Sequence, residues 1–285
     1  MHSVPSLPPL PVQALLRQHN LRPDRRLGQN FLVDDNALRK VVAAAEISPG
    51  MQILEIGAGL GSLTRYLAIQ SSHVTAVELD QRLLPILTRV IEPYSNIRIV
   101  EGDILRLDPS ELMGAESYRV VANIPYYITS AVIRHLLETH NQPDCLVLTV
   151  QKEVAERICS GPGEMSLLAL SVQVYGQPEI AARIPAGAFY PVPKVDSAVV
   201  RVDLSSPPGI PLEMLDTFFR LAKAGFSQKR KTLRNALAGG MGWKTLQSEA
   251  LLEAAGINPM RRAETLMVSE WERLTRQYYE TQPDV

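Results

Sequence analysis

Short apolar runs alternate with helical patterns between residues 51 and 160, and this alternation constrains the fold more than any other feature of the sequence. The apolar runs occupy residues 51–56, 73–79, 97–102, 118–123 and 145–150, and helical patterns follow at 62–69, 82–90, 130–139 and 152–160. Strands that are apolar on both faces and alternate with helices form a parallel sheet covered on both sides. The pattern therefore predicts an α/β chain with a doubly wound, Rossmann-like sheet.

The parts of the chain outside this region have a different character. Residues 1–11 are rich in proline and are expected to form a loose tail. Two late strands are expected at 179–184 and 196–204, and their short connection predicts an antiparallel pair at the end of the sheet. The segment 205–211, SSPPGIP, is the clearest linker.

We therefore expect three parts along the chain: an N-terminal extension over 1–20, an α/β domain over 21–205 and a small all-helical domain over 206–285. Ahead of the sheet, residues 22–35 are expected to form a loop, and Asn36 is expected to cap a helix that runs to Glu46. The remaining helical patterns lie at 13–19, 213–224, 229–238, 245–255 and 269–279.

Composition excludes several classes of protein. The chain has 285 residues, 46% of them hydrophobic, and a net charge of −1, which excludes a disordered chain and a uniformly basic nucleic-acid coat. Its two cysteines lack the spacing of a disulfide framework, and no histidines stand at metal-ligand spacing, so we assign no metal site. No stretch is long and apolar enough for a signal peptide or a membrane span, so the chain is expected to be cytoplasmic.

A glycine-rich loop follows the first strand of the sheet. Gly57, Gly59 and Gly61 stand between that strand and the next helix, where glycine lets a ligand approach the backbone closely. Glu78 ends the second strand, about 20 residues further on, where an acidic residue accepts hydrogen bonds from ribose hydroxyls. This pair of features predicts a nucleotide site and fits NAD and S-adenosylmethionine equally well.

Two further motifs follow strands at the same edge. Asp103 comes directly after the third strand, where its carboxylate suits an adenine amino group and, taken alone, equally suits a cap on the following turn. NIPYYIT, residues 123–129, comes after the fourth strand. The Asn123 side-chain oxygen and a nearby carbonyl suit the two hydrogens of an exocyclic amine, and Tyr126 suits stacking on a planar base. This motif favours methyl transfer over hydride transfer.

The order of the motifs along the chain is specific. LGQNFL at 27–32, EIGAGLG at 55–61, NIPYYIT at 123–129, QKEVAERI at 151–158 and FYPVPKVDSAVVRV at 189–202 occur in sequence. Together they resemble the ribosomal RNA adenine N6-dimethyltransferase family, and within it the small-subunit enzymes that confer kasugamycin sensitivity. The resemblance covers about residues 12–280. Tyr127 is a departure, because many bacterial members carry Asn there.

The resemblance implies a Rossmann-like, S-adenosylmethionine-dependent methyltransferase with a small helical C-terminal domain. It also implies a substrate: two adjacent adenosines in a hairpin loop near the 3′ end of 16S rRNA, in the small subunit or its precursor, methylated by a monomer. For the cofactor it implies contacts from Gln29, Asn30, Leu32, Gly57, Gly59, Glu78, Asp103, Ile104 and Asn123. It implies that Asn123 bridges the cofactor and the target amine, and that Tyr126 and Phe189 form an aromatic pair that sandwiches the target base.

Two basic clusters are candidates for RNA contact. Arg25 and Arg26, with Arg22, precede the GQNFL motif near the expected mouth of the site. Lys229, Arg230, Lys231 and Arg234 are expected on one helix of the C-terminal domain, where they would meet phosphates. A merely solvated helix face is an equally good interpretation of the second cluster.

Other functions remain open at this point. The large-subunit adenine methyltransferases of macrolide resistance share the fold and NIPY, but PKVDSAVVRV favours the small-subunit enzyme. DNA adenine methyltransferases usually carry two prolines before the aromatic residue, unlike residues 123–126. A non-catalytic assembly or transcription factor on the same scaffold is disfavoured by the intact Gly57, Glu78, Asp103 and Asn123.

Overall fold

The computed structural model describes residues 4–125, 128–206 and 209–281. It divides into two compact units: unit 1 comprises the chain up to Ala155 together with Pro178–Ser205, and unit 2 comprises Glu156–Gln177 together with the chain from Ser206 onward. The division expected from the sequence differs in one respect, because it assigned residues 156–177 to the α/β part. In the structure this segment belongs to the helical unit, and Tyr175 stacks on Phe219 there at a centroid distance of 6.2 Å.

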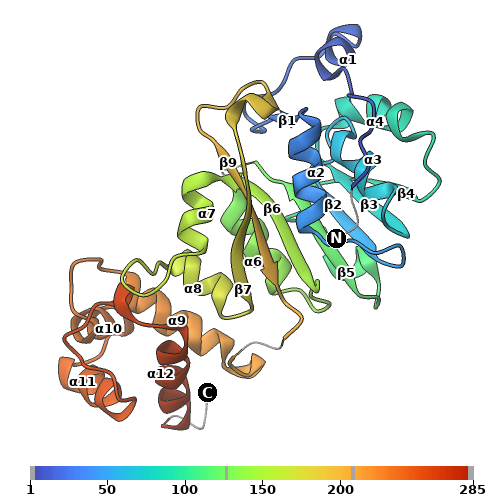
Figure 1. The fold of residues 1–285 in the computed structure, drawn as a ribbon. Helices are drawn as coiled ribbons and strands as arrows, with labels where there is room; N and C mark the ends of the chain where they lie inside the picture. Colours follow the sequence, from blue (N-terminus) through green and yellow to red (C-terminus); the bar gives the residue numbers. More distant parts are fainter. Residues whose placement is uncertain (1–3, 126–127, 207–208, 282–285) are drawn as a thin grey trace. The chain divides into compact units, whose positions relative to one another are not determined.

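Unit 1 contains a seven-stranded sheet with the order β4-β3-β2-β5-β6-β9-β7 (Figure 1). The strands are β2 Gln52–Ile56, β3 His73–Glu78, β4 Ile97–Glu101, β5 Tyr118–Asn123, β6 Cys145–Gln151, β7 Gln177–Ile184 and β9 Ser197–Asp203. The first five pair in parallel, and β9 pairs antiparallel with β6. The predicted parallel sheet is confirmed, and the two late strands lie side by side at its end.

A two-stranded sheet stands apart from the large one. Its strands are β1, Phe31–Leu32, and β8, Phe189–Tyr190, which pair antiparallel with Phe31 opposite Tyr190. The sequence predicted only a loop at residues 22–35, because two residues are too few for a periodic pattern.

The helices of unit 1 connect these strands on both faces of the sheet. They are α1 Val12–Gln18, α2 Asp35–Ala44, α3 Ser62–Ala68, the 3-10 helix η1 Gln81–Leu83, α4 Leu84–Ile91, α5 Pro109–Met113, α6 Thr129–Leu137, α7 Lys152–Ile158, whose end belongs to unit 2, and the 3-10 helix η3 Ala186–Ala188. The expected cap at Asn36 is wrong: Asp34 is the N-cap, and its carboxylate accepts from the Ala37 N–H at 2.8 Å.

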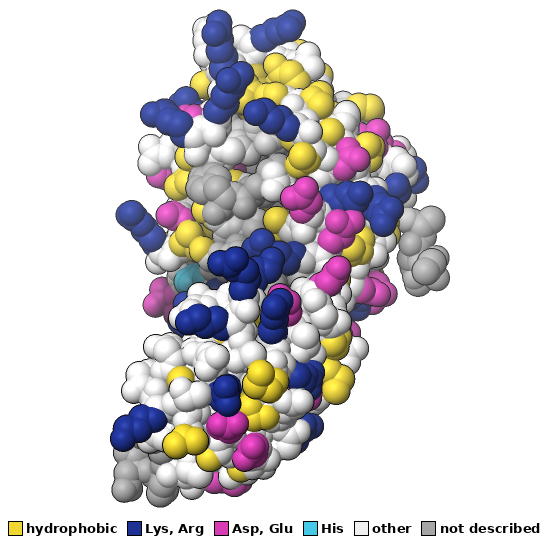
Figure 2. All heavy atoms as spheres, turned by 90° about the vertical axis from the view of Figure 1, so that its left-hand side faces the viewer, with side chains coloured by type: hydrophobic (Ala, Val, Ile, Leu, Met, Phe, Trp, Pro, Cys, Tyr) yellow, Lys and Arg dark blue, Asp and Glu magenta, His cyan; other side chains and the backbone are white. Residues whose placement is uncertain are grey.

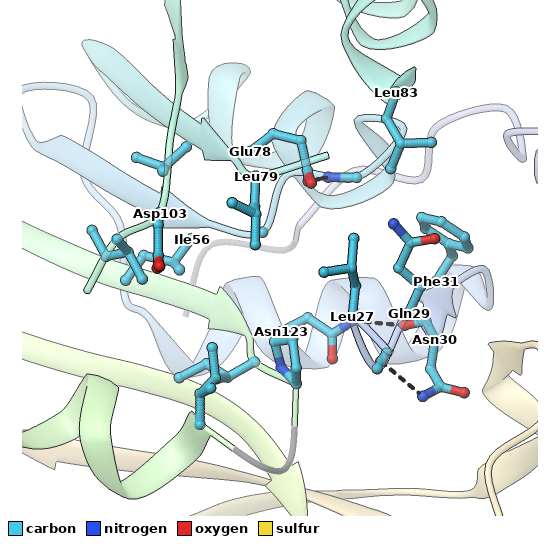
Figure 3. Close-up of a pocket in the computed structure, with 18 of the residues that line it drawn as sticks. Leu27, Gln29, Asn30, Phe31, Ile56, Glu78, Leu79, Leu83, Asp103 and Asn123 are labelled. Atoms are coloured by element: carbon cyan, nitrogen blue, oxygen red, sulfur yellow. Dashed lines mark hydrogen bonds between the residues drawn. The ribbon is translucent and has the colours of Figure 1, made fainter. Parts of the chain in front are cut away.

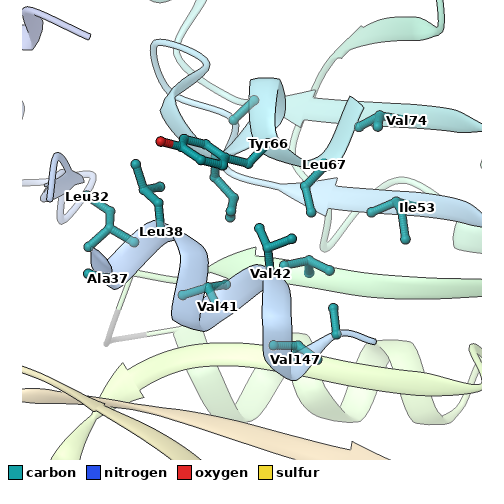
Figure 4. Packing of buried hydrophobic residues seen from close by; sticks show 14 of the residues in the cluster. Leu32, Ala37, Leu38, Val41, Val42, Ile53, Tyr66, Leu67, Val74 and Val147 are labelled. Carbon is teal, nitrogen blue, oxygen red and sulfur yellow. The ribbon is translucent and has the colours of Figure 1, made fainter. Parts of the chain in front are cut away.

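One core cluster of unit 1 lies between the sheet and helices α2 and α3 (Figure 4). Val41 and Val42 of α2 are fully buried against strand residues that include Ile53, Val74 and Val147. Burying an aliphatic side chain of this size stabilises the fold by about 1.5–3 kcal/mol. This packing fixes the carboxyl ends of the strands, where the sequence places its polar motifs.

The N-terminal segment 4–11 is docked on unit 1 and is not the loose tail that the sequence predicted. The Leu7 N–H donates to the Tyr66 hydroxyl at 3.1 Å, and the Arg65 guanidinium donates to the Pro8 carbonyl at 3.1 Å and 3.2 Å. Helix α1 packs next to it, with Val12 and Leu16 buried against Phe31. Composition missed this docking because proline-rich chains satisfy few hydrogen bonds of their own but still accept them from partners.

Unit 2 consists of helices packed around Trp271. They are α8 Leu167–Gln173, the 3-10 helix η4 Leu212–Met214, α9 Leu215–Phe226, α10 Leu233–Met241, α11 Thr245–Ala254, the 3-10 helix η5 Ala263–Thr265 and α12 Val268–Glu280. Trp271 is fully buried and stacks on Phe226 at a centroid distance of 5.6 Å. Glycines allow close approach here: a Cβ at Gly240 of α10 would lie 2.6 Å from the Ala224 backbone of α9.

Candidate functional site

A pocket lies in unit 1 at the carboxyl edge of strands β2, β3 and β5 (Figure 3). In an open α/β sheet this edge is where ligands bind. Its lining comes from segments predicted from the sequence: Leu27, Gly28, Gln29, Asn30, Phe31, Ile56, Gly57, Gly59, Val77, Glu78, Leu79, Leu83, Gly102, Asp103, Ile104, Asn123, Ile124, Pro125 and Ile128.

The glycine loop bends between β2 and α3 in a conformation that suits glycine. Gly57, Gly59 and Gly61 have φ values of 78°, 58° and 86°, in the region that favours glycine. The N–H groups of Gly57 and Ala58 donate to the Val77 carbonyl at 2.9 Å and 3.1 Å, which ties the loop to β3. The loop is therefore a fixed wall of the pocket, and its glycines leave the backbone open to a ligand.

The Glu78 carboxylate is buried at the end of β3, with only 6% of the residue exposed. One oxygen accepts from the Gly59 N–H at 2.6 Å and the other from the Asp80 N–H at 2.8 Å. Burial raises the pKa of this carboxyl, and the backbone hydrogen bonds oppose that shift. Each oxygen keeps a lone pair for a ligand hydroxyl.

The far wall of the pocket combines one carboxylate with apolar side chains. Asp103 follows β4, with 32% of its side chain exposed, and it forms a loose ion pair with Arg106 at 3.8 Å. Ile104 is buried beside it, and Ile56, Val77 and Leu79 add further apolar surface. A flat apolar slot with one acceptor at its edge suits a purine that carries an amino group.

Asn123 is held at the end of β5 by a contact to the opposite wall. Its side-chain Nδ2 donates to the Asn30 carbonyl at 2.9 Å (Figure 3). Since an amide side chain has its acceptor on the other atom, this bond leaves the Asn123 Oδ1 as a hydrogen-bond acceptor at the pocket. Asn30 in turn donates to the Gly28 carbonyl at 3.1 Å, so the two asparagines join residues 28–30 to β5.

Gln29 lines the pocket but its side chain is used by the protein itself. Its Nε2 donates to the Asp80 carboxylate at 2.7 Å, and its Oε1 accepts from the Asp24 N–H at 2.8 Å. Arg82 contacts both carboxylates, at 2.7 Å from Asp80 and 3.5 Å from Asp24. The Arg82 guanidinium lowers the pKa of Asp80, so this network stays charged at neutral pH.

Two predicted site residues lie in the core. The side chains of Leu32 and Phe189 belong to the buried cluster of unit 1 and are 3% and 2% exposed. They face each other across the β1–β8 pair. Phe31, which sequence reasoning passed over, lines the pocket instead, and a Cβ at Gly59 would lie 3.1 Å from its ring. The alternation of side chains along a strand would have separated Phe31 from Leu32 had the strand been recognised.

Two predicted residues lie outside the described part of the chain. Tyr126, predicted to stack on the target base, and its neighbour Tyr127 are not among the described residues. The residues on either side, Pro125 and Ile128, line the pocket.

The predicted basic residues divide between the two units. In unit 1, Arg25 is exposed, and Arg26 pairs with Asp24 at 3.1 Å. In unit 2, Lys229, Arg230 and Lys231 form a turn before α10, so the prediction that they lie on a helix is wrong. The helix pattern was extended too far, because charged residues fit a turn and a helix surface equally well.

The basic turn of unit 2 contributes to a separate hollow. Lys229 and Lys231 line it together with Arg157 and Lys223. Arg234 is on α10 and pairs with Glu249 at 3.1 Å, so its charge is partly compensated. The three cations of the turn have no such partner among the residues that the structure describes.

The described residues hold neither a metal-binding cluster nor a membrane-spanning helix. No group of three or more histidine, cysteine, aspartate or glutamate side chains is arranged to hold a metal ion in the described part of the chain. Nor is any helix of that part long and apolar enough to cross a bilayer.

The sheet order, the glycine loop and the carboxylate at the end of β3 define a Rossmann-like, nucleotide-binding protein. The family described as ribosomal RNA adenine dimethylase matches residues 20–275. A ribosomal RNA small subunit methyltransferase A from Dehalococcoides mccartyi (strain CBDB1) is 44% identical over 278 residues, covering 96% of each chain. One from Moorella thermoacetica is 41% identical over 274 residues, covering 92% of this chain and 95% of its own.

Solved structures agree with these relatives. The 23S rRNA methyltransferase ErmE superposes with a TM-score of 0.70 at 28% identity, covering 87% of this chain and 99% of its own. A dimethyladenosine transferase from Plasmodium falciparum superposes with a TM-score of 0.73 at 26% identity, covering 89% of this chain and 98% of its own. The chain belongs to the ribosomal RNA adenine dimethylase family.

Proposed function

We propose that this chain dimethylates N6 of two adjacent adenosines in the 3′-terminal hairpin loop of 16S rRNA, using S-adenosylmethionine. The observation that carries the proposal is the amide of Asn123, which the Asn30 carbonyl orients so that Oδ1 is an acceptor at the pocket. The relatives named as small subunit methyltransferases support the choice of 16S rRNA.

The pocket residues fit S-adenosylmethionine. Glu78 offers a buried carboxylate to the ribose hydroxyls, and Asp103 with Ile104 offers an acceptor and an apolar wall to the adenine. Gly57 and Gly59 leave room for the methionine part, and Asn30 and Gln29 close the opposite side. We assign Leu32 an indirect role, since its side chain supports the wall from the core.

S-adenosylmethionine supplies an activated methyl group when bound, so the protein has mainly to position the acceptor nitrogen. The Asn123 Oδ1 and the carbonyl of Ile124 accept the two hydrogens of the adenine amine, which directs the nitrogen lone pair at the methyl group. The amine loses its proton after the new bond forms, so no general base is required. Once monomethylated, the amine keeps one hydrogen, and one acceptor then suffices.

Aromatic residues are proposed to hold the target base, with Tyr126 stacking on it and Phe189 supporting it from the core. For contact with phosphates we propose Arg25 and Arg26 in unit 1 and the basic turn 229–231 with Arg234 in unit 2. Unit 1 is then the catalytic part, and unit 2 an RNA-binding part. We further propose that a monomer acts in the cytoplasm on the small subunit or its precursor, with a role in small-subunit biogenesis.

Transfer of labelled methyl groups tests the reaction. Unmethylated small subunits, large-subunit RNA and DNA are offered in parallel, and the product nucleosides are identified after digestion. We expect N6,N6-dimethyladenosine in 16S rRNA alone. Label in large-subunit RNA alone would move the chain to the resistance methyltransferases, and cofactor binding without any label would leave an assembly factor.

Substitution of Asn123 tests the positioning mechanism. We expect Asn123→Ala to lower kcat about 100-fold, the scale of a lost positioning contact, while cofactor affinity measured by calorimetry changes little. Asn123→Asp keeps an acceptor but loses the donor to the Asn30 carbonyl, so it should retain part of the activity. Asn36→Ala, an exposed asparagine of α2, is the control. Equal losses of turnover and cofactor affinity in Asn123→Ala would refute this role.

A further inference from the structure

A second hollow lies in unit 1 next to the cofactor pocket. It is formed by α1 with the segment after it, by the loop 190–195 that follows β8, and by Gln151 at the carboxyl end of β6. Strands β5 and β6 are parallel neighbours, so Gln151 and Asn123 belong to the same edge of the sheet.

One segment of chain separates the hollow from the cofactor pocket. Gly28, Gln29 and Asn30 line both. The next residue, Phe31, pairs with Tyr190, and the loop 190–195 that lines the hollow begins at Tyr190. A molecule whose reacting group lies at Asn123 can therefore extend past residues 28–30 into this hollow.

The charged side chains of the hollow are all positive. Arg17, Arg22, Arg25 and Lys194 line it and are exposed, and no carboxylate is among its described lining residues. Within the described chain none of the four forms an ion pair, whereas the neighbouring Arg26 is paired with Asp24 at 3.1 Å. Figure 2 shows Lys and Arg side chains gathered at the top of the molecule, the end where Figure 1 places α1.

The loop side of the hollow is apolar and exposed. Val192 and Val195 are 65% and 41% exposed, and Pro191 and Pro193 lie beside them. Tyr190 adds a half-buried aromatic ring. Cations that track a phosphate chain next to an apolar or aromatic platform are the usual arrangement for a single-stranded nucleic acid.

We propose that this hollow holds the RNA strand next to the target adenosine, with its phosphates on Arg17, Arg22, Arg25 and Lys194. The neighbouring base rests against Tyr190 and Val192. This inference rests on the proposed function and adds a subsite to it, formed by α1 and the loop 190–195. An apolar platform accepts adenine with or without methyl groups on N6, so the neighbouring adenosine fits there before and after its own methylation.

The test is a set of single variants of the full-length protein: Arg17→Gln, Arg22→Gln and Lys194→Gln, each assayed with unmethylated small subunits. We expect KM for the subunits to rise about three- to tenfold in each variant, with kcat and cofactor affinity within twofold of the unsubstituted protein. Binding to a hairpin RNA of the 16S 3′-terminal sequence, followed by anisotropy, should show the salt dependence of log K reduced by about 0.7 per lost contact.

The apolar side of the hollow has its own test. Val192→Asp places a carboxylate at an exposed position, so folding should be unaffected and RNA affinity should fall. An RNA with an abasic site beside the target adenosine should bind the unsubstituted protein more weakly, and the Val192→Asp protein should no longer distinguish the two RNAs. If Val192→Asp and the abasic site lower RNA affinity independently and additively, the neighbouring base does not rest against Val192, and this assignment is overturned.

Exposed arginines elsewhere in unit 1 are the matched controls. Arg89→Gln on α4 and Arg183→Gln on β7 remove the same charge away from the hollow's lining. If the hollow variants behave as these controls do, the subsite is refuted while the proposed function stands. If the unsubstituted protein itself transfers no methyl group to small subunits, the proposed function fails first.

Discussion

Glu55 is a buried carboxyl in β2, directly before the glycine loop, and it makes the stability of unit 1 depend on pH. The residue is 1% exposed, and its Oε2 has no hydrogen-bond partner among the described residues. Burial, with a further contribution from the Glu78 carboxylate, raises the pKa of Glu55 from an ordinary 4.5 to about 8. We expect that Glu55→Gln removes this pH dependence.

The sign follows from the order of the two pKa values. Glu55 ionises near pH 4.5 in the unfolded chain and near pH 8 in the folded chain. The contribution of the protonated carboxyl to the stability of the folded state is therefore complete below pH 4.5 and is lost as the pH rises to 8. One pH unit corresponds to about 1.4 kcal/mol, so the loss at pH 7 is about 3 kcal/mol. A glutamine amide buried without a partner costs about 1–3 kcal/mol, but equally at every pH.

The assay is urea unfolding at pH 5, 6, 7 and 8, followed by far-UV circular dichroism. Tryptophan fluorescence in the same samples follows unit 2, because Trp243 and Trp271 both belong to that unit. We expect the free energy of unfolding of Glu55→Gln, relative to the unsubstituted protein, to rise by about 2.5 kcal/mol between pH 5 and pH 7. Glu92→Gln, an exposed glutamate, is the control. Parallel pH profiles for Glu55→Gln and the unsubstituted protein would refute the reasoning.

Three further substitutions test the packing around the site. Gly59→Ala puts a Cβ 3.1 Å from the Phe31 ring at a φ of 58°. Calorimetry should therefore show weaker cofactor binding, and the free energy of unfolding should fall by about 1–2 kcal/mol. Unchanged cofactor binding would contradict the close approach. Tyr66→Phe removes the hydroxyl that holds residues 4–11, and limited proteolysis should then cut this segment faster than in the unsubstituted protein. Gly240→Ala forces α10 off the α9 backbone, so the fluorescence transition of unit 2 should shift by about 1–3 kcal/mol, and no shift would show that the helices adjust freely.

The sequence predicted the large sheet well because its strands are apolar on both faces and its helices are regular. The pocket was predictable for a related reason: Gly57, Glu78, Asp103 and Asn123 each end or follow a strand, and parallel strands bring their carboxyl ends to one edge. Residues separated by long stretches of sequence thus meet without any pairwise signal.

The segments whose structure the sequence did not predict have a different feature in common. The residues that hold each of them in place are distant in the sequence. Residues 4–11 are held by Arg65 and Tyr66, and β1 exists because β8 pairs with it. Local composition contains no trace of such contacts, so both segments resembled loops. The same holds for Gln29, whose amide is used by Asp80 on a neighbouring strand end.

Residues 28–30 form a wall between two hollows, and their position has a thermodynamic consequence. The segment is fixed on one side by Asn123 and on the other by the Gln29 contacts to Asp24 and Asp80. A ligand that displaces this wall from one side changes the shape that a second ligand meets on the other side. Linkage makes such an effect reciprocal, so RNA changes the affinity for cofactor by the same factor by which cofactor changes the affinity for RNA.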